Sequence, residues 1–348
     1  MLASNNKKIF FLSYYYNLPG ACQAEWASDR VNAMHSLGHN VTVLTSFVSS
    51  ASDKEKIIRI PSLGFKDARD EIAYYSENNK PNIFQKFIIF IFSILGIPFD
   101  FLIKLLTKKI GEGRWMWAFT SIFRALLSAD LYKSDSIIST GGPASSHLAA
   151  VILSKIVNKK CLIELQDPMS GEGIGRESSK GLLQKMEHFL LRHASISVFV
   201  TKTASLEAIE KYNIKNIDYI YPGAPEYNLE PKKIDNPSKL DLIHMGSLYG
   251  SRNLFSLTSA INSLESIYKD RFTISNIGHV DKEISTSNYK DTKVSFLSHT
   301  TRELAIQTAK NFDVMLLIQN TDGRSSSTIP FKTYDYLQLG MPILALIN

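Results

Sequence analysis

Cysteine is almost absent from this chain of 348 residues, in which only Cys22 and Cys161 occur. Two isolated cysteines supply neither a disulfide framework nor a zinc cage, so the composition fits a reducing, cytoplasmic setting. The H-E-x-x-H pattern of zinc enzymes is also missing. We therefore expect no metal and no cofactor. Residues 1–8 lead directly into a strand-like run, so no secretory signal is visible.

No hydrophobic run is long enough to be a clean membrane span. The longest, Phe87–Phe99, is interrupted by a glycine and a proline and continues into a second apolar segment with Lys104, Lys108 and Lys109 at its end. Apolar bulk followed by lysines suits helices that lie on an anionic membrane surface, here the inner face of the cell membrane. A buried helix pair in the first domain fits the same residues, and both alternatives stay open.

Basic residues outnumber acidic ones by 39 to 33, and the formal net charge is +6. This balance favours anionic partners such as nucleotides, phosphorylated lipids or membrane surfaces. The basic residues are scattered and not interleaved with aromatic ones, so no nucleic acid partner is expected. Neither a Walker lysine pattern nor a G-x-G-x-x-G fingerprint follows the predicted strands.

Apolar runs and helix-like segments alternate along the chain, as in an α/β protein. Residues 8–16 predict a buried strand, the apolar spacing over 24–37 predicts a helix, and residues 41–45 predict the next strand. A strand–helix–strand unit of this kind has parallel strands. The pattern continues to a Pro- and Gly-rich stretch at 217–225, and a second series begins near residue 240.

We therefore predict two α/β domains, residues 1–222 and 223–348, each a doubly wound parallel sheet with ligands beyond the carboxyl ends of its strands. The expected strands of the second domain are 240–245, 272–278, 294–297, 314–318 and 343–347. Thr300–Glu303 has the pattern of a capping box that opens a helix. Because the chain stops at Asn348, directly after a strand, the second domain is expected to be incomplete.

The stretch from Pro330 to Pro342 predicts a helix with both ends marked. Pro330 suits the first helical position, because its missing N–H would have no partner there. Gly340 suits the left-handed stop, and Pro342 blocks continuation of the helix.

The start of this helix combines several groups that suit a phosphate. Ser327 and Thr328 bring hydroxyls to it, and Lys332 adds a cation beside the free N–H groups. Asp335 lies three residues after Lys332 on the same helix face, where a carboxylate suits the hydroxyl pair of a sugar. Together these residues indicate a nucleotide-sugar pocket, although an ordinary helix start has the same pattern.

A second candidate anion loop follows the strand 240–245. Gly246 lets the backbone approach an anion, Ser247 adds a hydroxyl, and Arg252 can fork onto phosphate oxygens. An ordinary strand-to-helix loop is the alternative.

Polar groups also follow the predicted strands of the first domain. His147 lies in the first turns of a helix, where a neutral imidazole could donate to a sugar hydroxyl. Asp167 follows the next strand and points to the same edge, although an aspartate before proline is commonly a turn former. Gly20 and Gln23 are candidates for an acceptor-side loop near the first strand.

Taken in order, these segments resemble glycosyltransferase family 4, whose two-domain fold is called GT-B. The segments that carry the resemblance are Phe10–Tyr16 with Leu37–Thr45, Ile138–His147, Leu165–Pro168, Tyr219–Gly223, His244–Arg252 and Pro330–Pro342. They cover essentially the whole chain.

The resemblance implies a retaining, metal-independent glycosyltransferase of the hexosyltransferase type. Its co-substrate would be a nucleotide-diphosphate sugar, and its acceptor a glycan or polyprenyl-linked molecule in the synthesis of surface polysaccharide (lipopolysaccharide, capsule or exopolysaccharide). The donor site would comprise Gly246, Ser247, Arg252, Ser327, Thr328, Lys332 and Asp335. Arg252 and Lys332 would stabilise charge on the leaving diphosphate, and His147 and Asp167 would orient sugar or acceptor.

The chain departs from the family pattern in two places. The family often has two glutamates separated by seven residues in the donor helix region, and these positions are Ser327 and Asp335 here. Asp335 can still accept ribose hydroxyls, whereas Ser327 cannot replace a carboxylate. Arg252 stands in for the more familiar lysine of the Gly246 loop. Two rival functions therefore stay open, a nucleotide-sugar epimerase of similar fold and a non-catalytic partner of another transferase.

Overall fold

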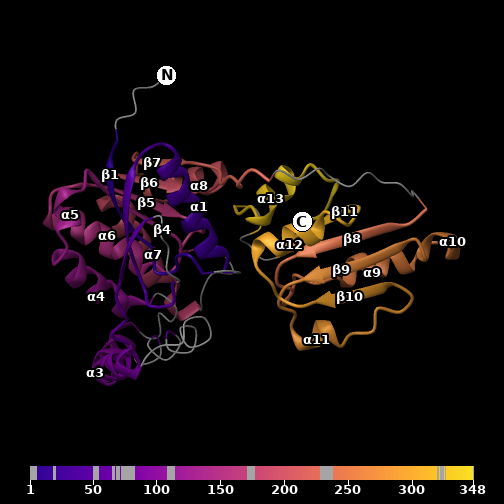
Figure 1. The fold of residues 1–348 in the computed structure, drawn as a ribbon, viewed down its shortest axis with the longest axis horizontal. Coiled ribbons are helices and arrows are strands. Elements are labelled where there is room, and N and C mark those ends of the chain that lie inside the picture. Colours follow the sequence, from indigo (N-terminus) through magenta and orange to yellow (C-terminus); the bar gives the residue numbers. More distant parts are fainter. Residues whose placement is uncertain are drawn as a thin grey trace. The chain divides into compact units, whose positions relative to one another are not determined.

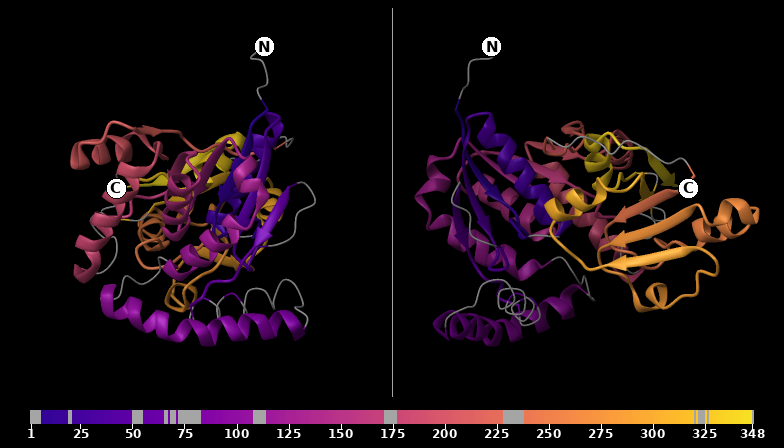
Figure 2. Two further views of the ribbon diagram at one scale, coloured as in Figure 1. Left: turned by 90° about the vertical axis from the view of Figure 1, so that its left-hand side faces the viewer. Right: turned by 45° about the vertical axis from the view of Figure 1, so that its right-hand side comes forward.

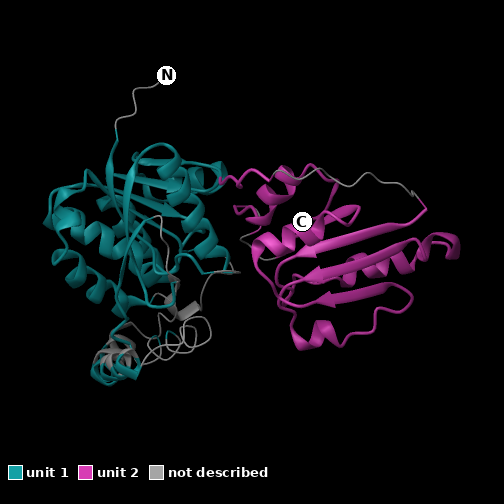
Figure 3. Cartoon of the chain, viewed as in Figure 1, with its two compact units in different colours: residues 1–221 teal, residues 222–348 magenta. Residues whose placement is uncertain are grey.

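The structure, a computed structural model, describes residues 6–18, 21–49, 55–64, 67, 71, 83–107, 114–170, 177–227, 238–319, 321, 325 and 327–347. The chain divides into two compact units, Met1–Tyr221 and Pro222–Asn348 (Figure 3). This boundary lies one residue before the position expected from the sequence.

Unit 1 is built on a seven-stranded sheet in the order β3-β2-β1-β4-β5-β6-β7, with every neighbouring pair parallel (Figure 1). Its strands are β1 (Lys8–Leu12), β2 (Asn40–Thr45), β3 (Lys56–Arg59), β4 (Ser136–Thr140), β5 (Lys160–Leu165), β6 (Ile196–Phe199) and β7 (Ile217–Tyr219). Phe10 and Phe11 point to opposite faces and are both fully buried, as in a sheet covered on both sides.

The helices of unit 1 are α1 (Cys22–Ser36), α3 (Ile83–Thr107), α4 (Trp115–Leu126), α5 (Ala129–Lys133), α6 (Ser145–Ile156), α7 (Glu177–His193) and α8 (Lys202–Tyr212). The helix pair expected around residues 87–109 is wrong, because α3 runs through Pro98 as one helix. An interior proline removes one backbone hydrogen bond and need not end a helix whose two halves share an apolar side. As far as the chain is described, no helix combines the length and hydrophobicity needed to cross a membrane.

Unit 2 has a five-stranded sheet in the order β10-β9-β8-β11-β12, again with parallel neighbours. Its strands are β8 (Leu240–Met245), β9 (Phe272–Ile277), β10 (Lys293–Leu297), β11 (Val314–Ile318) and β12 (Ile343–Leu346). Its helices are α9 (Phe255–Asn262), α10 (Ser266–Lys269), α11 (Lys282–Ser285), α12 (Arg302–Ala309) and α13 (Lys332–Leu339). Leu242 and Ile243 of β8 belong to separate hydrophobic clusters on the two faces of the sheet.

The prediction of two α/β units with parallel sheets is confirmed. Two helix starts are shifted. Thr301, and not Thr300, caps α12, because its side chain accepts from the Leu304 N–H. Pro330 lies before α13, which begins at Lys332, while Gly340 ends this helix in the left-handed conformation as expected.

Candidate functional site

Two glycines stand at the carboxyl edge of the sheet in unit 2. Gly246 follows β8 with φ +130, and Gly278 follows β9 with φ +141. A Cβ on Gly278 would lie 2.5 Å from the Gly246 carbonyl oxygen, so the two backbones are in direct contact. A side chain on Gly278 would not fit this contact, so the two backbones can approach only because glycine is there.

Lys332, the first residue of α13, reaches across to this edge. Its Nζ lies 2.5 Å from Nε2 of His244, near the end of β8. A Cβ on Gly246 would lie 2.7 Å from the same Nζ. The structure therefore brings together two segments far apart in the sequence, the loop after β8 and the start of α13.

His244 holds this lysine as a neutral ring. Its side chain is completely buried, and its Nδ1 lies 2.6 Å from the Asn276 Oδ1. Burial lowers the pKa of His244 well below its ordinary value, and the charges of Lys332 and Arg252 lower it further, while Asn276 acts in the opposite direction. With Nδ1–H donating to Asn276, Nε2 is left to accept from the ammonium.

Arg252 is the second cation whose charge acts on His244. Its guanidinium stacks over the Tyr249 ring at 5.3 Å, and the two residues exchange backbone hydrogen bonds of 3.0 Å. Among the described residues, no hydrogen-bond partner is found for its buried Nε. The edge of unit 2 thus combines two cations, exposed backbone and a helix start, which suits a phosphate anion.

A hydroxyl-bearing segment is held beside this edge by Gln319, which follows β11. The Gln319 Nε2 donates to the carbonyl oxygens of Ser325 and Thr328 at 2.6 and 3.0 Å. Ser327 is buried and Thr328 is half-buried, as is Ser247 in the loop after β8. The structure therefore places the predicted hydroxyl residues in the loops that border Lys332.

Asp335 has partners inside unit 2. Its Oδ1 accepts from Arg302 Nη2 at 2.6 Å and from the Tyr227 hydroxyl at 2.8 Å. The side chains of Arg302 and Asp335 are only 11% and 5% exposed, and the guanidinium lies over the Phe331 ring at 4.7 Å. This buried pair positions the first turn of α13, and a contact of Asp335 with ribose stays a prediction.

Tyr336 is a further positioning residue that carries no sequence signal. It is fully buried in α13, and its hydroxyl accepts from the Met245 N–H at 2.9 Å and donates to the Leu316 carbonyl at 3.1 Å. The bond to Met245 ties α13 to the residue before Gly246. Tyr336 thereby sets the position of Lys332 relative to the glycine loop.

In unit 1, His147 lies near the start of α6 with its Nδ1 2.9 Å from the Ser139 Oγ. Burial lowers its pKa to about 4, although a hydrogen bond to the Gly141 backbone acts in the opposite direction. The ring is therefore neutral near pH 7. It is only 2% exposed, and its donation to a sugar stays a prediction.

The side-chain amide of Gln23 lies beside the loop after β4. A Cβ on Gly142 would lie 3.2 Å from the Gln23 Nε2, and one on Gly141 would lie 3.5 Å from the Gln166 Nε2. Asp167 follows Gln166 and is exposed. The carboxyl edge of unit 1 therefore gathers amide groups with Asp167 beside them, whereas Gly20 lies outside the described residues.

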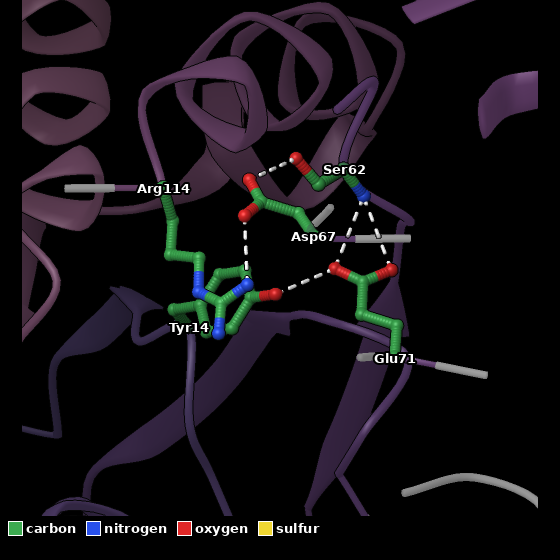
Figure 4. A network of polar contacts seen from close by, with 5 residues as sticks. All are labelled: Tyr14, Ser62, Asp67, Glu71 and Arg114. Carbon is green, nitrogen blue, oxygen red and sulfur yellow. Dashed lines mark hydrogen bonds and ion pairs between the residues drawn. The ribbon is translucent and has the colours of Figure 1, made fainter. Parts of the chain in front are cut away.

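A polar network that was not expected from the sequence joins the segment after β3 to the segment after β1 (Figure 4). The Tyr14 hydroxyl donates to Glu71 at 2.8 Å, and both oxygens of Glu71 accept from the Ser62 N–H at 3.2 Å. Asp67 accepts from Ser62 and from Arg114, which directly precedes α4. These residues are up to 100 positions apart (114 − 14), so no local pattern reveals the network.

Replacing Glu71 by glutamine should reduce the pH dependence of unit 1 stability. Burial raises the pKa of Glu71 from 4.5 to about 8, so the folded state holds a proton that the unfolded state releases. The resulting stabilisation is present below pH 4.5 and is lost as the pH rises towards 8. Between pH 5.5 and 8.5 the wild type should lose about 3 kcal/mol of unfolding free energy through the titration of Glu71. The Glu71→Gln variant should not show this loss.

Denaturant unfolding followed by tryptophan fluorescence measures this effect, since all three tryptophans lie in unit 1. Trp117 packs against the Tyr14 ring at 5.4 Å. The exposed Glu210 of α8 gives a matched control as Glu210→Gln. An equal stability difference between wild type and Glu71→Gln at both pH values would contradict the assignment.

In the described part of the chain, no three His, Cys, Asp or Glu side chains are grouped so that they could hold a metal ion.

No protein-family model matches the sequence, and no curated protein matches it. The fold does match solved structures. Anabaena HepE, solved with UDP and glucose, has a TM-score of 0.60 at 13% identity, covering 98% of this chain and 80% of that one.

Two further solved structures are similar. Sucrose-phosphate synthase from Thermosynechococcus elongatus has a TM-score of 0.61 at 12% identity, covering 98% of this chain and 81% of that one. TarM has a TM-score of 0.61 at 9% identity, covering 99% and 86%. Both units of this chain therefore have the α/β fold of GT-B glycosyltransferases.

Proposed function

We propose that this protein is a glycosyltransferase that takes its sugar from a nucleotide-diphosphate sugar, with the diphosphate held in unit 2. The observation that carries the proposal is the contact between the Lys332 ammonium and Gly246, where a Cβ would lie 2.7 Å from Nζ. This contact sets a cation against the backbone at the end of a strand. The solved complexes of HepE with UDP and with UDP-glucose support the choice of ligand.

The roles proposed for the two cations follow from the place where negative charge develops during sugar transfer. When the bond between sugar and diphosphate breaks, the leaving diphosphate gains negative charge, and fixed cations stabilise it more than they stabilise the substrate. Lys332, held by His244, and Arg252, stacked on Tyr249, are two such cations. The N–H groups at the start of α13 and in the Gly246 loop would complete the site.

Unit 1 would supply the acceptor side. Gln23 and Asp167 border the loop after β4, and the neutral His147 lies at the base of the same loop. We assign to these residues the orientation of sugar or acceptor, and we propose transfer with retention of configuration to a glycan or lipid-linked acceptor of surface polysaccharide synthesis. The lipopolysaccharide outer core galactosyltransferase WaaB, which is among the similar structures with a TM-score of 0.51, supports this setting.

The test is release of nucleoside diphosphate from a panel of nucleotide sugars, with and without a membrane fraction that provides acceptors. Release that depends on acceptor is the expected result. Conversion of the donor sugar without acceptor would instead identify an epimerase. Absence of binding to every nucleotide sugar in calorimetry would identify a non-catalytic protein and overturn the proposal.

Replacing Gly246 by alanine should lower donor affinity about tenfold, because the new Cβ takes the place of the Lys332 ammonium. Loss of one hydrogen bond to a charged group costs about 1.5 kcal/mol or more. Gly340→Ala is the matched control, since Gly340 also has positive φ (+64) but no atom within 4 Å of an added Cβ, and it lies at the carboxyl end of α13, away from Lys332. Calorimetry with UDP compares the two, and equal affinities would contradict the lysine contact.

A further inference from the structure

The helix α3 carries an apolar face that is open to solvent. Ten of its large apolar side chains are between 38% and 87% exposed, namely Ile83, Phe84, Phe87, Phe90, Ile91, Ile94, Leu95, Ile97, Phe101 and Leu102. A helix of a globular protein normally turns such a stripe towards the core. In both views of Figure 2, α3 forms the outer edge of unit 1.

Gly96 fixes which side of α3 meets the protein. It is buried, and a Cβ there would lie 2.0 Å from the Leu63 carbonyl oxygen, so the helix rests directly on the backbone after β3. At about 100° per residue, Phe87 lies opposite Gly96, and all ten exposed side chains lie at least about 100° from it. The apolar face therefore points away from unit 1 over nearly half of the helix circumference.

The neighbouring helix α4, which contacts α3, carries an exposed apolar stripe of its own. Phe119, Phe123 and Leu127 follow one another at intervals of four residues and are 59%, 67% and 67% exposed. The opposite side of α4 is buried, with Trp117 and Ala125 in the interior. Exposed apolar stripes on two contacting helices exceed the single exposed apolar residues that are normal on soluble proteins.

Charge distinguishes the possible occupants of this surface. From residue 83 to 109 the sequence contains four lysines and one aspartate, which gives a net charge of 4 − 1 = +3. A symmetric contact with a second copy would bring two such segments together and oppose like charges. An anionic bilayer matches both the apolar face and the positive charge.

We propose that α3 and α4 dock unit 1 onto an anionic membrane surface, with α3 lying in the plane of the interface and Gly96 on its protein side. The phenylalanines would enter the boundary between head groups and acyl chains, about 5–10 Å deep, as interfacial helices do. This surface belongs to unit 1 and the proposed nucleotide site is built from residues of unit 2, so either proposal can fail without the other.

The experiment is co-sedimentation of the full chain with vesicles of phosphatidylglycerol and phosphatidylcholine, compared with phosphatidylcholine alone. Binding should require phosphatidylglycerol and weaken as salt is added. The triple variant Phe87→Gln, Ile94→Gln, Phe101→Gln should bind at least tenfold less. The double variant Phe119→Gln, Phe123→Gln should also bind less, which tests the part played by α4.

The control removes exposed apolar side chains elsewhere, as Ile267→Gln with Leu304→Gln in unit 2, where these residues are 62% and 52% exposed. This variant should bind like the wild type. Sedimentation velocity without lipid tests the rival occupant. A wild-type dimer that the triple variant converts to a monomer would overturn the proposal, as would absence of vesicle binding or equal binding by all variants.

Discussion

Replacing Lys332 by alanine is expected to lower donor affinity and turnover by about ten- to a hundredfold. The ammonium faces the Gly246 loop and is fixed by the neutral His244. A hydrogen bond to a charged group is worth about 1.5–3 kcal/mol, which corresponds to this range. If the bond strengthens as the diphosphate leaves, part of the loss should appear in kcat as well as in KM.

The measurement is UDP calorimetry with steady-state kinetics on the best donor of the panel. Lys293→Ala is the matched control, because Lys293 is exposed at the first residue of β10, at the amino edge of the same sheet. The Lys293→Ala variant should leave the UDP dissociation constant, kcat and KM unchanged. A Lys332→Ala protein that binds UDP and turns over donor like the wild type would remove the basis for the diphosphate site.

Replacing Arg302 by methionine is expected to destabilise unit 2 by about 3–5 kcal/mol, because it leaves the carboxylate of Asp335 buried without its charge partner. The pair is joined at 2.6 Å, and both side chains are almost fully covered. The substitution also removes the stacking of the guanidinium on Phe331. The start of α13 should loosen, so UDP affinity should fall although Arg302 itself is not placed on the ligand.

Urea unfolding followed by circular dichroism measures the loss in both units, while tryptophan fluorescence follows unit 1 alone. The fluorescence transition therefore serves as an internal control for a defect confined to unit 2. Arg271→Met is the matched variant, since Arg271 also stacks on an aromatic ring, Tyr268 at 5.1 Å, but is exposed. Equal unfolding free energies of the two variants would show that the Arg302–Asp335 pair contributes little to the stability of unit 2.

The sheets could be predicted from the sequence because their signals are local. Apolar runs such as those of β8 and β11 need only their own residues to be recognised, and the helix stop at Gly340 follows from one residue's conformational freedom. The strand β3 was missed because four residues bounded by charges carry no clear alternation. The cap of α12 shifted by one residue because two threonines stand in a row there.

The internal partners of the candidate site could not be predicted, because they join positions far apart in the sequence. Lys332 and His244 are 88 residues apart, and Arg302 and Asp335 are 33 apart. The shared helix face of Lys332 and Asp335 suggested a common ligand. In the structure the lysine turns to the glycine loop, whereas the carboxylate turns to a buried arginine that belongs to another helix.

Amide hydrogen exchange with and without saturating UDP can show whether the diphosphate binds in unit 2, because it locates the bound ligand on the chain. Slowed exchange is expected in the Gly246–Arg252 loop and in the first turn of α13 around Lys332. The amides of α8 in unit 1 should be unaffected. Saturated binding without protection in either of the two unit 2 segments would contradict the account.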